Sequence, residues 1–144
     1  MTTVQNILQA KGNQVISVSP ETLVSTALEL MAEKNVGALV VIKDGALAGI
    51  FSERDFARTS VSKGSAALGS IVKDLMTSVV VTVTPQQSIE DCMAAMTAKR
   101  VRHLPVLENQ ILIGVVSIGD VVKAVISEKE HLIKQLENYI TGTR

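Results

Sequence analysis

The sequence predicts a protein of the α/β (α+β) class, made of two β-α-β-β-α repeats packed with pseudo-two-fold symmetry. The main observation is an internal repeat: a shift of 65 residues aligns residues 15–58 with residues 80–123 without a gap, and 12 of the 44 pairs are identical. The second observation is that β-branched runs alternate with helical apolar spacing in both copies. Because one unit of about 50 residues has a single thin apolar face, the two copies are expected to share a core and to form two related clefts where they meet.

Each copy is expected to begin with a strand followed by a helix. The strands are predicted at residues 15–19 and 80–84, which are rich in β-branched residues. Ser19-Pro20 and Thr84-Pro85 follow the pattern of an N-cap and a first-turn proline, so a helix is expected from each proline, with Gln87 completing a capping box in the second copy. Apolar residues then recur at helical spacing, at Val24, Ala27, Leu28 and Met31 and again at Ile89, Cys92, Met93 and Met96.

A hairpin and a second helix should complete each copy. The hairpin strands are predicted at residues 38–42 with 47–51 and at residues 104–107 with 111–116. Asp44-Gly45 is a strong signal for the first turn, and the second falls around Asn109. The second helices are expected from about Ser52 and Ser117.

These elements predict four segments along the chain. The first repeat is assigned to residues 4–58, a linker to 59–71, the second repeat to 72–126, and a C-terminal helix and tail to 127–144. The linker is rich in Ser, Gly and Ala, and residues 121–140 carry an amphipathic apolar stripe. We expect the projecting helix to pack on a partner subunit, the alternative being that it packs on its own module.

Composition excludes several classes of protein. The chain has 14 Lys+Arg and 14 Asp+Glu, a balance that argues against nucleic-acid binding, and it is too apolar, at 47% hydrophobic residues, to be disordered. No apolar run reaches the roughly 18 residues of a membrane helix, and the N-terminus lacks the pattern of a secretory signal. With a single cysteine, Cys92, and two histidines, we expect a cytoplasmic protein without a metal site.

The motifs of the two copies are similar to those of a known family. The pair of units resembles a tandem CBS-domain module (cystathionine β-synthase domain, or Bateman module), standing alone without an attached catalytic or transport domain. The motifs are Val-Ser-Pro and Val-Thr-Pro before the first helices, Val36-Gly-Ala-Leu-Val-Val41 with Val101-Arg-His-Leu-Pro-Val106, and Gly49-Ile-Phe-Ser-Glu-Arg-Asp55 with Gly114-Val-Val-Ser-Ile-Gly-Asp120.

This resemblance implies a regulatory, non-catalytic module that binds adenine nucleotides in the clefts between its repeats. The ligands expected are AMP, ADP or ATP, and less often NAD or S-adenosylmethionine; none acts as a catalytic cofactor. The module is expected to form a homodimer and to signal to an unidentified protein partner. The alternatives are a structural dimerisation scaffold with vestigial clefts and an S-adenosylmethionine sensor. An enzyme is disfavoured because the sequence has no P-loop, no Gly-x-Ser-x-Gly elbow and no paired metal ligands.

The Ser-x-x-Asp sequences at the start of the second helices are the central candidate site. Taken alone, Ser52 with Asp55 and Ser117 with Asp120 could simply cap their helices. A carboxylate fixed at a helix start can also accept two hydrogen bonds from vicinal hydroxyls. The resemblance implies that each Asp accepts both ribose hydroxyls of the nucleotide.

The two clefts are expected to differ in charge. The resemblance implies that Arg102 and His103 meet a phosphate in the cleft of Asp55; the alternative is that they form a solvated strand start. The first copy has Gly37 and Ala38 at the corresponding positions. The cleft of Asp120 should therefore be roomier and less charged. The first cleft is predicted to be lined by Ser52, Arg54, Asp55, Thr82, Arg102, His103 and Leu104. The second is predicted to be lined by Ser17, Val18, Gly37, Ala38, Ser117 and Asp120.

Overall fold

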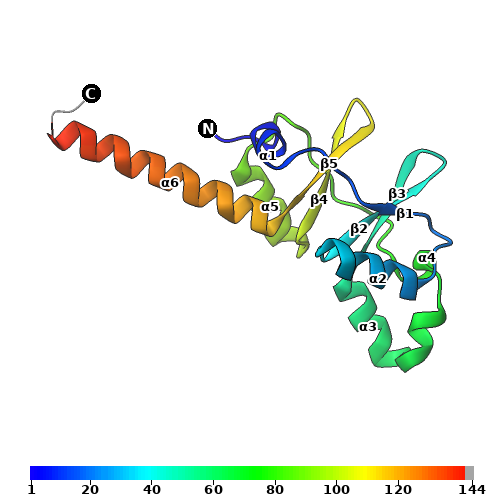
Figure 1. Ribbon diagram of the computed structural model, residues 1–144. Coiled ribbons are helices and arrows are strands. Elements are labelled where there is room, and N and C mark those ends of the chain that lie inside the picture. Colours follow the sequence, from blue (N-terminus) through cyan, green and yellow to red (C-terminus); the bar gives the residue numbers. More distant parts are fainter. Residues whose placement is uncertain (142–144) are drawn as a thin grey trace. The chain divides into compact units, whose positions relative to one another are not determined.

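The computed structural model describes residues 1–141, and in it the first repeat builds a three-stranded sheet in the order β1-β2-β3 (Figure 1). Strand β1 (Ser17–Val18) runs parallel to β2 (Ala38–Lys43), which pairs antiparallel with β3 (Ala46–Ser52). The second repeat has the corresponding hairpin, β4 (His103–Glu108) with β5 (Ile111–Ser117). The predicted mixture of helices and strands in two repeats is confirmed.

Both hairpins turn through a pair of residues in the left-handed region. Asp44 and Gly45 have φ of 52° and 79°, and Asn109 and Gln110 have φ of 52° and 68°. Positive φ at both central residues is the geometry of a type I′ turn, whose twist matches that of the flanking strands. The predicted Asp-Gly turn is therefore confirmed, and the second copy adopts the same geometry without a glycine.

The prediction that helices begin at the two prolines is wrong. Helix α2 (Val24–Lys34) and helix α5 (Ile89–Lys99) begin four residues further on. Pro20 and Pro85 lie instead in turns, in which the Thr22 amide donates to the Ser19 carbonyl at 3.1 Å and the Gln87 amide donates to the Thr84 carbonyl at 3.2 Å. The fixed φ of proline suits the second position of a β-turn as well as the first turn of a helix.

The predicted capping box of Thr84 and Gln87 is also displaced. The Gln87 side chain does accept from the Thr84 amide, at 2.9 Å, but within the turn rather than at a helix start. Helix α5 is capped by Ser88, whose hydroxyl accepts from the Asp91 amide while the Asp91 carboxylate accepts from the Ser88 amide. This capping box has the same form as those at the candidate site.

The first strands are shorter than predicted, and the region after Arg58 is more helical. Strand β1 spans two residues, and in the second repeat the only remnant within the described chain is a bridge between Val83 and Val106. Helix α3 (Glu53–Lys63) and a 3-10 helix, η1 (Gly64–Gly69), occupy most of the segment predicted as a linker.

The chain forms two compact units. The helical segment that precedes the first strand of each repeat, here called its lead-in, packs in the core of the other repeat's unit. One unit comprises Gln14–Val80 and Gln110–Leu112; the other comprises the N-terminal residues and the rest of the second repeat. Helix α1 (Val4–Lys11), although it precedes the first repeat, buries Val4, Ile7 and Leu8 in the core of the second. Helix α4 (Val72–Leu75) buries Val72 and Leu75 in the core of the first.

Two equivalent glycines accommodate these exchanged lead-ins. A Cβ at Gly49 would lie 2.7 Å from the Thr77 carbonyl oxygen, just after α4. A Cβ at Gly114 would lie 2.7 Å from Leu8 Cδ2 of α1. In each repeat a glycine at the same position therefore allows the segment that precedes the other repeat to approach closely.

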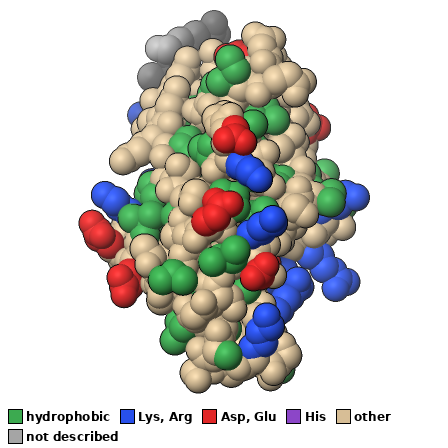
Figure 2. Space-filling model, turned by 90° about the vertical axis from the view of Figure 1, so that its right-hand side faces the viewer, with side chains coloured by type: hydrophobic (Ala, Val, Ile, Leu, Met, Phe, Trp, Pro, Cys, Tyr) green, Lys and Arg blue, Asp and Glu red, His purple; other side chains and the backbone are tan. Residues whose placement is uncertain are grey.

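The predicted second helix of the second repeat and the amphipathic C-terminal segment form one helix, α6 (Ile118–Thr141). The last three positions of the predicted tail lie outside the described residues. No helix within residues 1–141 is long and apolar enough to cross a membrane. Both signs of charge occur, among hydrophobic side chains, on the face shown in Figure 2.

Candidate functional site

Ser52 and Asp55 form a reciprocal capping box at the start of α3. The Asp55 amide donates to Ser52 Oγ at 3.2 Å, and Asp55 Oδ2 accepts from the Ser52 amide at 2.9 Å and from the Ser52 hydroxyl at 3.1 Å. Both side chains are half-buried. This arrangement satisfies amides that a helix start leaves without partners and fixes the position of the carboxylate.

Thr77 is a second partner of Asp55 that the sequence did not reveal. Its hydroxyl donates to Asp55 Oδ1 at 3.3 Å. Thr77 follows helix α4, and its backbone pairs with Ile50 of β3 through hydrogen bonds of 2.9 Å in both directions. The exchanged lead-in thus delivers a hydroxyl to the candidate carboxylate of the first repeat.

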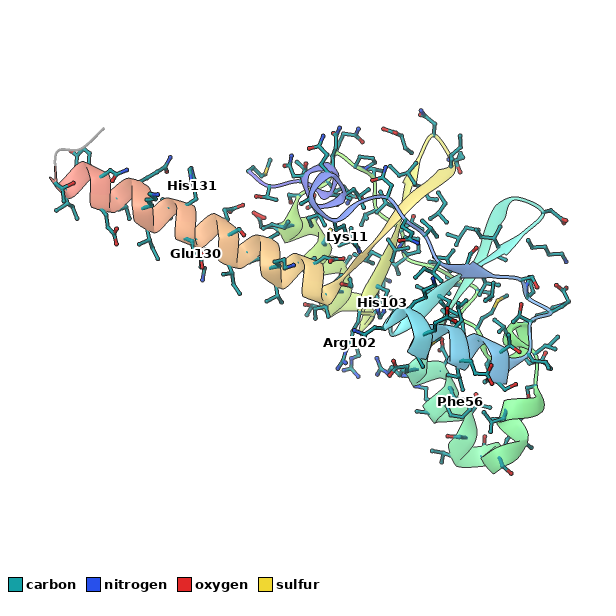
Figure 3. The ribbon with its side chains drawn as sticks, in the orientation of Figure 1. Lys11, Phe56, Arg102, His103, Glu130 and His131 are labelled. Atoms are coloured by element: carbon teal, nitrogen blue, oxygen red, sulfur yellow. The ribbon has the colours of Figure 1, made fainter. Side chains whose placement is uncertain are left out.

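Ser117 and Asp120 repeat the arrangement at the start of α6, with a cation added. Asp120 Oδ2 accepts from the Ser117 amide at 2.8 Å and from Lys11 Nζ at 2.7 Å, and Lys11 Nζ also donates to the Val115 carbonyl at 2.9 Å. Figure 3 labels Lys11 at the end of α1. Lys11 gives Asp120 a charged neighbour that the repeat motifs do not indicate, because Lys11 lies outside the aligned repeat.

The surroundings of Asp120 keep its carboxylate ionised. Partial burial by itself would raise the pKa, but the hydrogen bonds from Lys11 and Ser117 and the charge of Lys11 outweigh burial and hold the pKa of Asp120 below its ordinary value. An ionised carboxylate accepts hydrogen bonds on both oxygens and donates none. Asp120 is therefore in the state that hydroxyl recognition requires.

The two carboxylates differ in how much accepting capacity they retain. Lys11 and the Ser117 amide donate to Asp120 Oδ2, whereas Asp55 accepts hydrogen bonds on both of its oxygens. A carboxylate offers about four acceptor positions. Each carboxylate therefore has acceptor positions beyond those that these protein groups fill, and Asp55 gains one more if the Thr77 hydroxyl turns away.

The residues predicted at the start of the first hairpin strand of each repeat lie beside the start of the helix that carries the Ser-x-x-Asp sequence. In one unit the Glu53 amide donates to the Gly37 carbonyl at 3.0 Å, and Ala38 pairs with Ser52. In the other the Ile118 amide donates to the Arg102 carbonyl at 2.8 Å. The hairpin of each repeat therefore brings its own strand start to its own Ser-x-x-Asp sequence.

The remaining predicted site residues lie in the strands and their approaches. Arg102 is exposed, and His103, which opens β4, is half-buried (Figure 3). Leu104 is fully buried in the core, so it can present its backbone to a ligand but little side chain. Thr82 is half-buried one residue before the Val83 bridge, Ser17 and Val18 form β1, and Arg54 is exposed on α3.

The predicted clefts combine residues from different units. The first joins Ser52, Arg54 and Asp55 of one unit to Thr82 and 102–104 of the other, and the second joins Ser17, Val18, Gly37 and Ala38 to Ser117 and Asp120. These groupings stay predictions.

Each unit also carries a hollow of its own. A hollow of about 250 Å³ borders Lys11 and Asp120, with Ile7, Ala10 and Ala124 supplying apolar surface. A hollow of about 330 Å³ borders Gly37 and Glu53. Within the described residues, no group of three or more His, Cys, Asp or Glu side chains could hold a metal ion.

Comparison with known proteins identifies the family. The model of the CBS domain matches residues 11–62 and 72–127, so the chain belongs to the CBS-domain family and carries two copies of the domain. It is 39% identical over 150 residues to the mitochondrial CBS domain-containing protein CBSX3 of Arabidopsis thaliana, covering 98% of this chain and 73% of that protein. The resemblance drawn from the motifs is confirmed.

Solved structures agree with this assignment. The CBS-domain containing protein ATU1752 from Agrobacterium tumefaciens is 40% identical, with a TM-score of 0.84, over 85% of this chain and 98% of that one. The structure of CBSX2 in complex with AMP is 29% identical, with a TM-score of 0.72, over 88% of this chain and 98% of that one.

Proposed function

We propose that this protein is a non-catalytic regulatory module that binds an adenine nucleotide, with AMP the first candidate and ADP, ATP and NAD next. The observation that carries the proposal is the pair of Ser-x-x-Asp helix starts, which hold two carboxylates in matching, half-buried positions. The similarity to a CBS-domain protein solved with AMP supports the choice of ligand.

Each carboxylate is assigned to the ribose. Vicinal hydroxyls donate two hydrogen bonds to one carboxylate, and bonds to a charged acceptor are stronger than neutral ones. The capping box fixes the carboxylate before the ligand arrives, so little ordering is needed on binding. Nearby amides at the helix starts favour an anionic group close by.

Phosphate recognition is assigned to Arg102 and His103 in the cleft of Asp55. The Arg102 side chain is exposed and offers a planar fork of donors that stays protonated. In the cleft of Asp120, Lys11 is the cation, and its ammonium can donate to a ligand oxygen while it keeps Asp120 ionised. Both clefts therefore have a basic side chain, contributed by different parts of the chain.

A homodimer, a protein partner that receives the signal and a cytoplasmic location belong to the same proposal. The second candidate is a dimerisation scaffold with vestigial clefts, and the observation in its favour is that Asp55 and Asp120 already have protein partners. An S-adenosylmethionine sensor would use the same ribose contacts.

Calorimetric titration with AMP, ATP, NAD and S-adenosylmethionine tests the proposal. A ligand that binds the native state also raises the melting temperature by mass action, which gives an independent readout. We expect saturable binding and a raised melting temperature with at least one adenine nucleotide, and no consumption of it. No binding by any of the four would favour the scaffold.

A further inference from the structure

Helix α6 carries an apolar stripe from Val122 to Ile140 that the described residues of its own unit leave largely exposed. Its large apolar side chains are between 51% and 84% exposed, namely Val122, Ile126, Leu132, Ile133, Leu136, Tyr139 and Ile140. Figure 1 shows α6 extending past α1 and α5, and Figure 3 shows Glu130 and His131 projecting from it without a neighbouring element. More than half of the surface of each of these side chains is left in contact with water, so burial against a partner would stabilise the helix.

The spacing of the stripe follows a heptad repeat. Position a is occupied by Ile126, Ile133 and Ile140, and position d by Val122, Lys129 and Leu136. Apolar residues at alternating intervals of three and four form the seam of a coiled coil. The one polar residue in the seam, Lys129, constrains how a second helix can lie against it.

Building on the homodimer of the proposed function, we propose that α6 pairs with α6 of a second copy of this chain as an antiparallel two-helix coiled coil. A parallel pair would place Lys129 against Lys129 of the partner copy within the seam. An antiparallel pair centred on residue 131 matches each a position with a d position: Ile126 with Leu136, Val122 with Ile140, and Lys129 with Ile133. The aliphatic stem of Lys129 can lie along Ile133 while its ammonium reaches solvent.

The charged flank of the seam agrees with the antiparallel arrangement. Position e carries Lys123, Glu130 and Glu137. In the antiparallel pair Lys123 of each copy meets Glu137 of the other, which gives two opposite-charge contacts. Glu130 meets Glu130 across the two-fold axis, at the solvent-exposed rim, where such a repulsion is weak.

The other flank is apolar and also matches itself. Position g carries Val125, Leu132 and Tyr139. The antiparallel pair places Leu132 against Leu132 and Tyr139 beside Val125, which also packs against the core of its own unit, so the apolar surface extends beyond the seam. A parallel pair would instead place Val125 and Leu132 against the carboxylates at position e.

Distance measurements between spin labels test the orientation. His131→Cys and Asn138→Cys place labels on the outer face of the helix, and the native Cys92 is fully buried and stays unlabelled. In the antiparallel pair, position 131 has no axial offset from its copy, whereas position 138 is offset by about 21 Å at 1.5 Å per residue. We therefore expect a clearly longer distance at 138 than at 131; equal distances, or no inter-copy signal at either position, would overturn the proposal.

Charge reversal tests the pairing of Lys123 with Glu137 at position e. Lys123→Glu and Glu137→Lys should each raise the dissociation constant of the pair roughly tenfold, and the double variant should restore it. Lys134→Glu is the matched control, since position 134 lies on the outer face. Helix content measured by circular dichroism shows that each variant folds. Equal weakening by all three single variants, or a double variant weaker than either single one, would contradict the antiparallel contact.

Discussion

Lys11 Nζ lies 2.7 Å from Asp120 Oδ2, which joins the end of the N-terminal helix to the start of a helix 109 residues later. The equivalent carboxylate of the other repeat, Asp55, receives the hydroxyl of Thr77 instead. Both partners come from the lead-in segments that the two repeats exchange. The exchange thus contributes buried residues to each core and supplies each candidate carboxylate with a hydrogen-bond donor.

Replacing Lys11 should change the dependence of stability on pH. The pKa of Asp120 is lowered in the folded state, so this contact stabilises the fold above the unfolded pKa and ceases to do so as the pH falls through the folded value. Because Lys11 is 36% exposed, Lys11→Met should lower the free energy of unfolding by about 0.5–1 kcal/mol at neutral pH. Denaturant titrations should show the difference from the parent shrinking below about pH 4.

Lys43→Met is the control for that experiment, since it removes an exposed lysine at the end of β2. It should change stability little at any pH. A Lys11→Met defect that persisted undiminished at pH 2 would mean that the contact with Asp120 is not its cause.

Alanine at the two equivalent glycines should have unequal effects. At Gly49 the new methyl group would meet the Thr77 carbonyl oxygen, a backbone atom that cannot move alone, and we expect a loss of about 1–3 kcal/mol. At Gly114 it would meet the end of the Leu8 side chain, which can change rotamer, so the loss should be smaller. Chemical denaturation measures both; equal losses would show that the approach of Thr77 is not decisive.

Cys92 should be unreactive in the native protein. Burial, and secondarily the charge of Asp91, raise the pKa of its thiol to about 11, and the thiolate is the reactive form. Iodoacetamide at neutral pH should modify Cys92 only after denaturation. A Val61→Cys variant supplies an exposed thiol as the positive control, and modification of both thiols at similar rates would refute the prediction.

The features that could be predicted from the sequence are those that are local and repeated. The order of elements and both hairpins follow from alternating apolar residues and turn signals at Asp44-Gly45. The helix starts at Pro20 and Pro85 were wrong because proline fits a turn and a helix start equally well, and only the later packing of α2 and α5 decides between them. Lys11 and Thr77 escaped notice because each meets a carboxylate of the other repeat's core. The signal available in the sequence was the similarity of residues 4–8, Val-Gln-Asn-Ile-Leu, to residues 72–76, Val-Lys-Asp-Leu-Met, which marks the two segments as equivalent parts of the repeats.

Arg102 should matter for the phosphate and not for the nucleoside. Arg102→Ala should weaken AMP binding more than adenosine binding, because the guanidinium contributes to phosphate recognition alone. Added salt should weaken AMP binding to the parent more than to the variant, since salt screens the attraction. Titrations of both ligands into both proteins give the ratio; an AMP-to-adenosine ratio unchanged by the substitution would remove Arg102 from the phosphate site.

AMP titration of carboxylate variants matched for helix capping tests ribose recognition by Asp55 and Asp120. Asp55→Ala and Asp120→Ala each remove a proposed ribose acceptor, whereas Asp91→Ala removes the same kind of capping carboxylate from α5, outside the proposed site. Each variant should lose about 0.5–1 kcal/mol of stability from the carboxylate at the helix start, and Asp120→Ala should lose somewhat more because it also removes the partner of Lys11. Asp55→Ala and Asp120→Ala should each weaken AMP about 10–150-fold in their own cleft, and Asp91→Ala should bind like the parent. AMP affinity unchanged in both site variants, or lowered equally in all three, would contradict ribose recognition by these carboxylates.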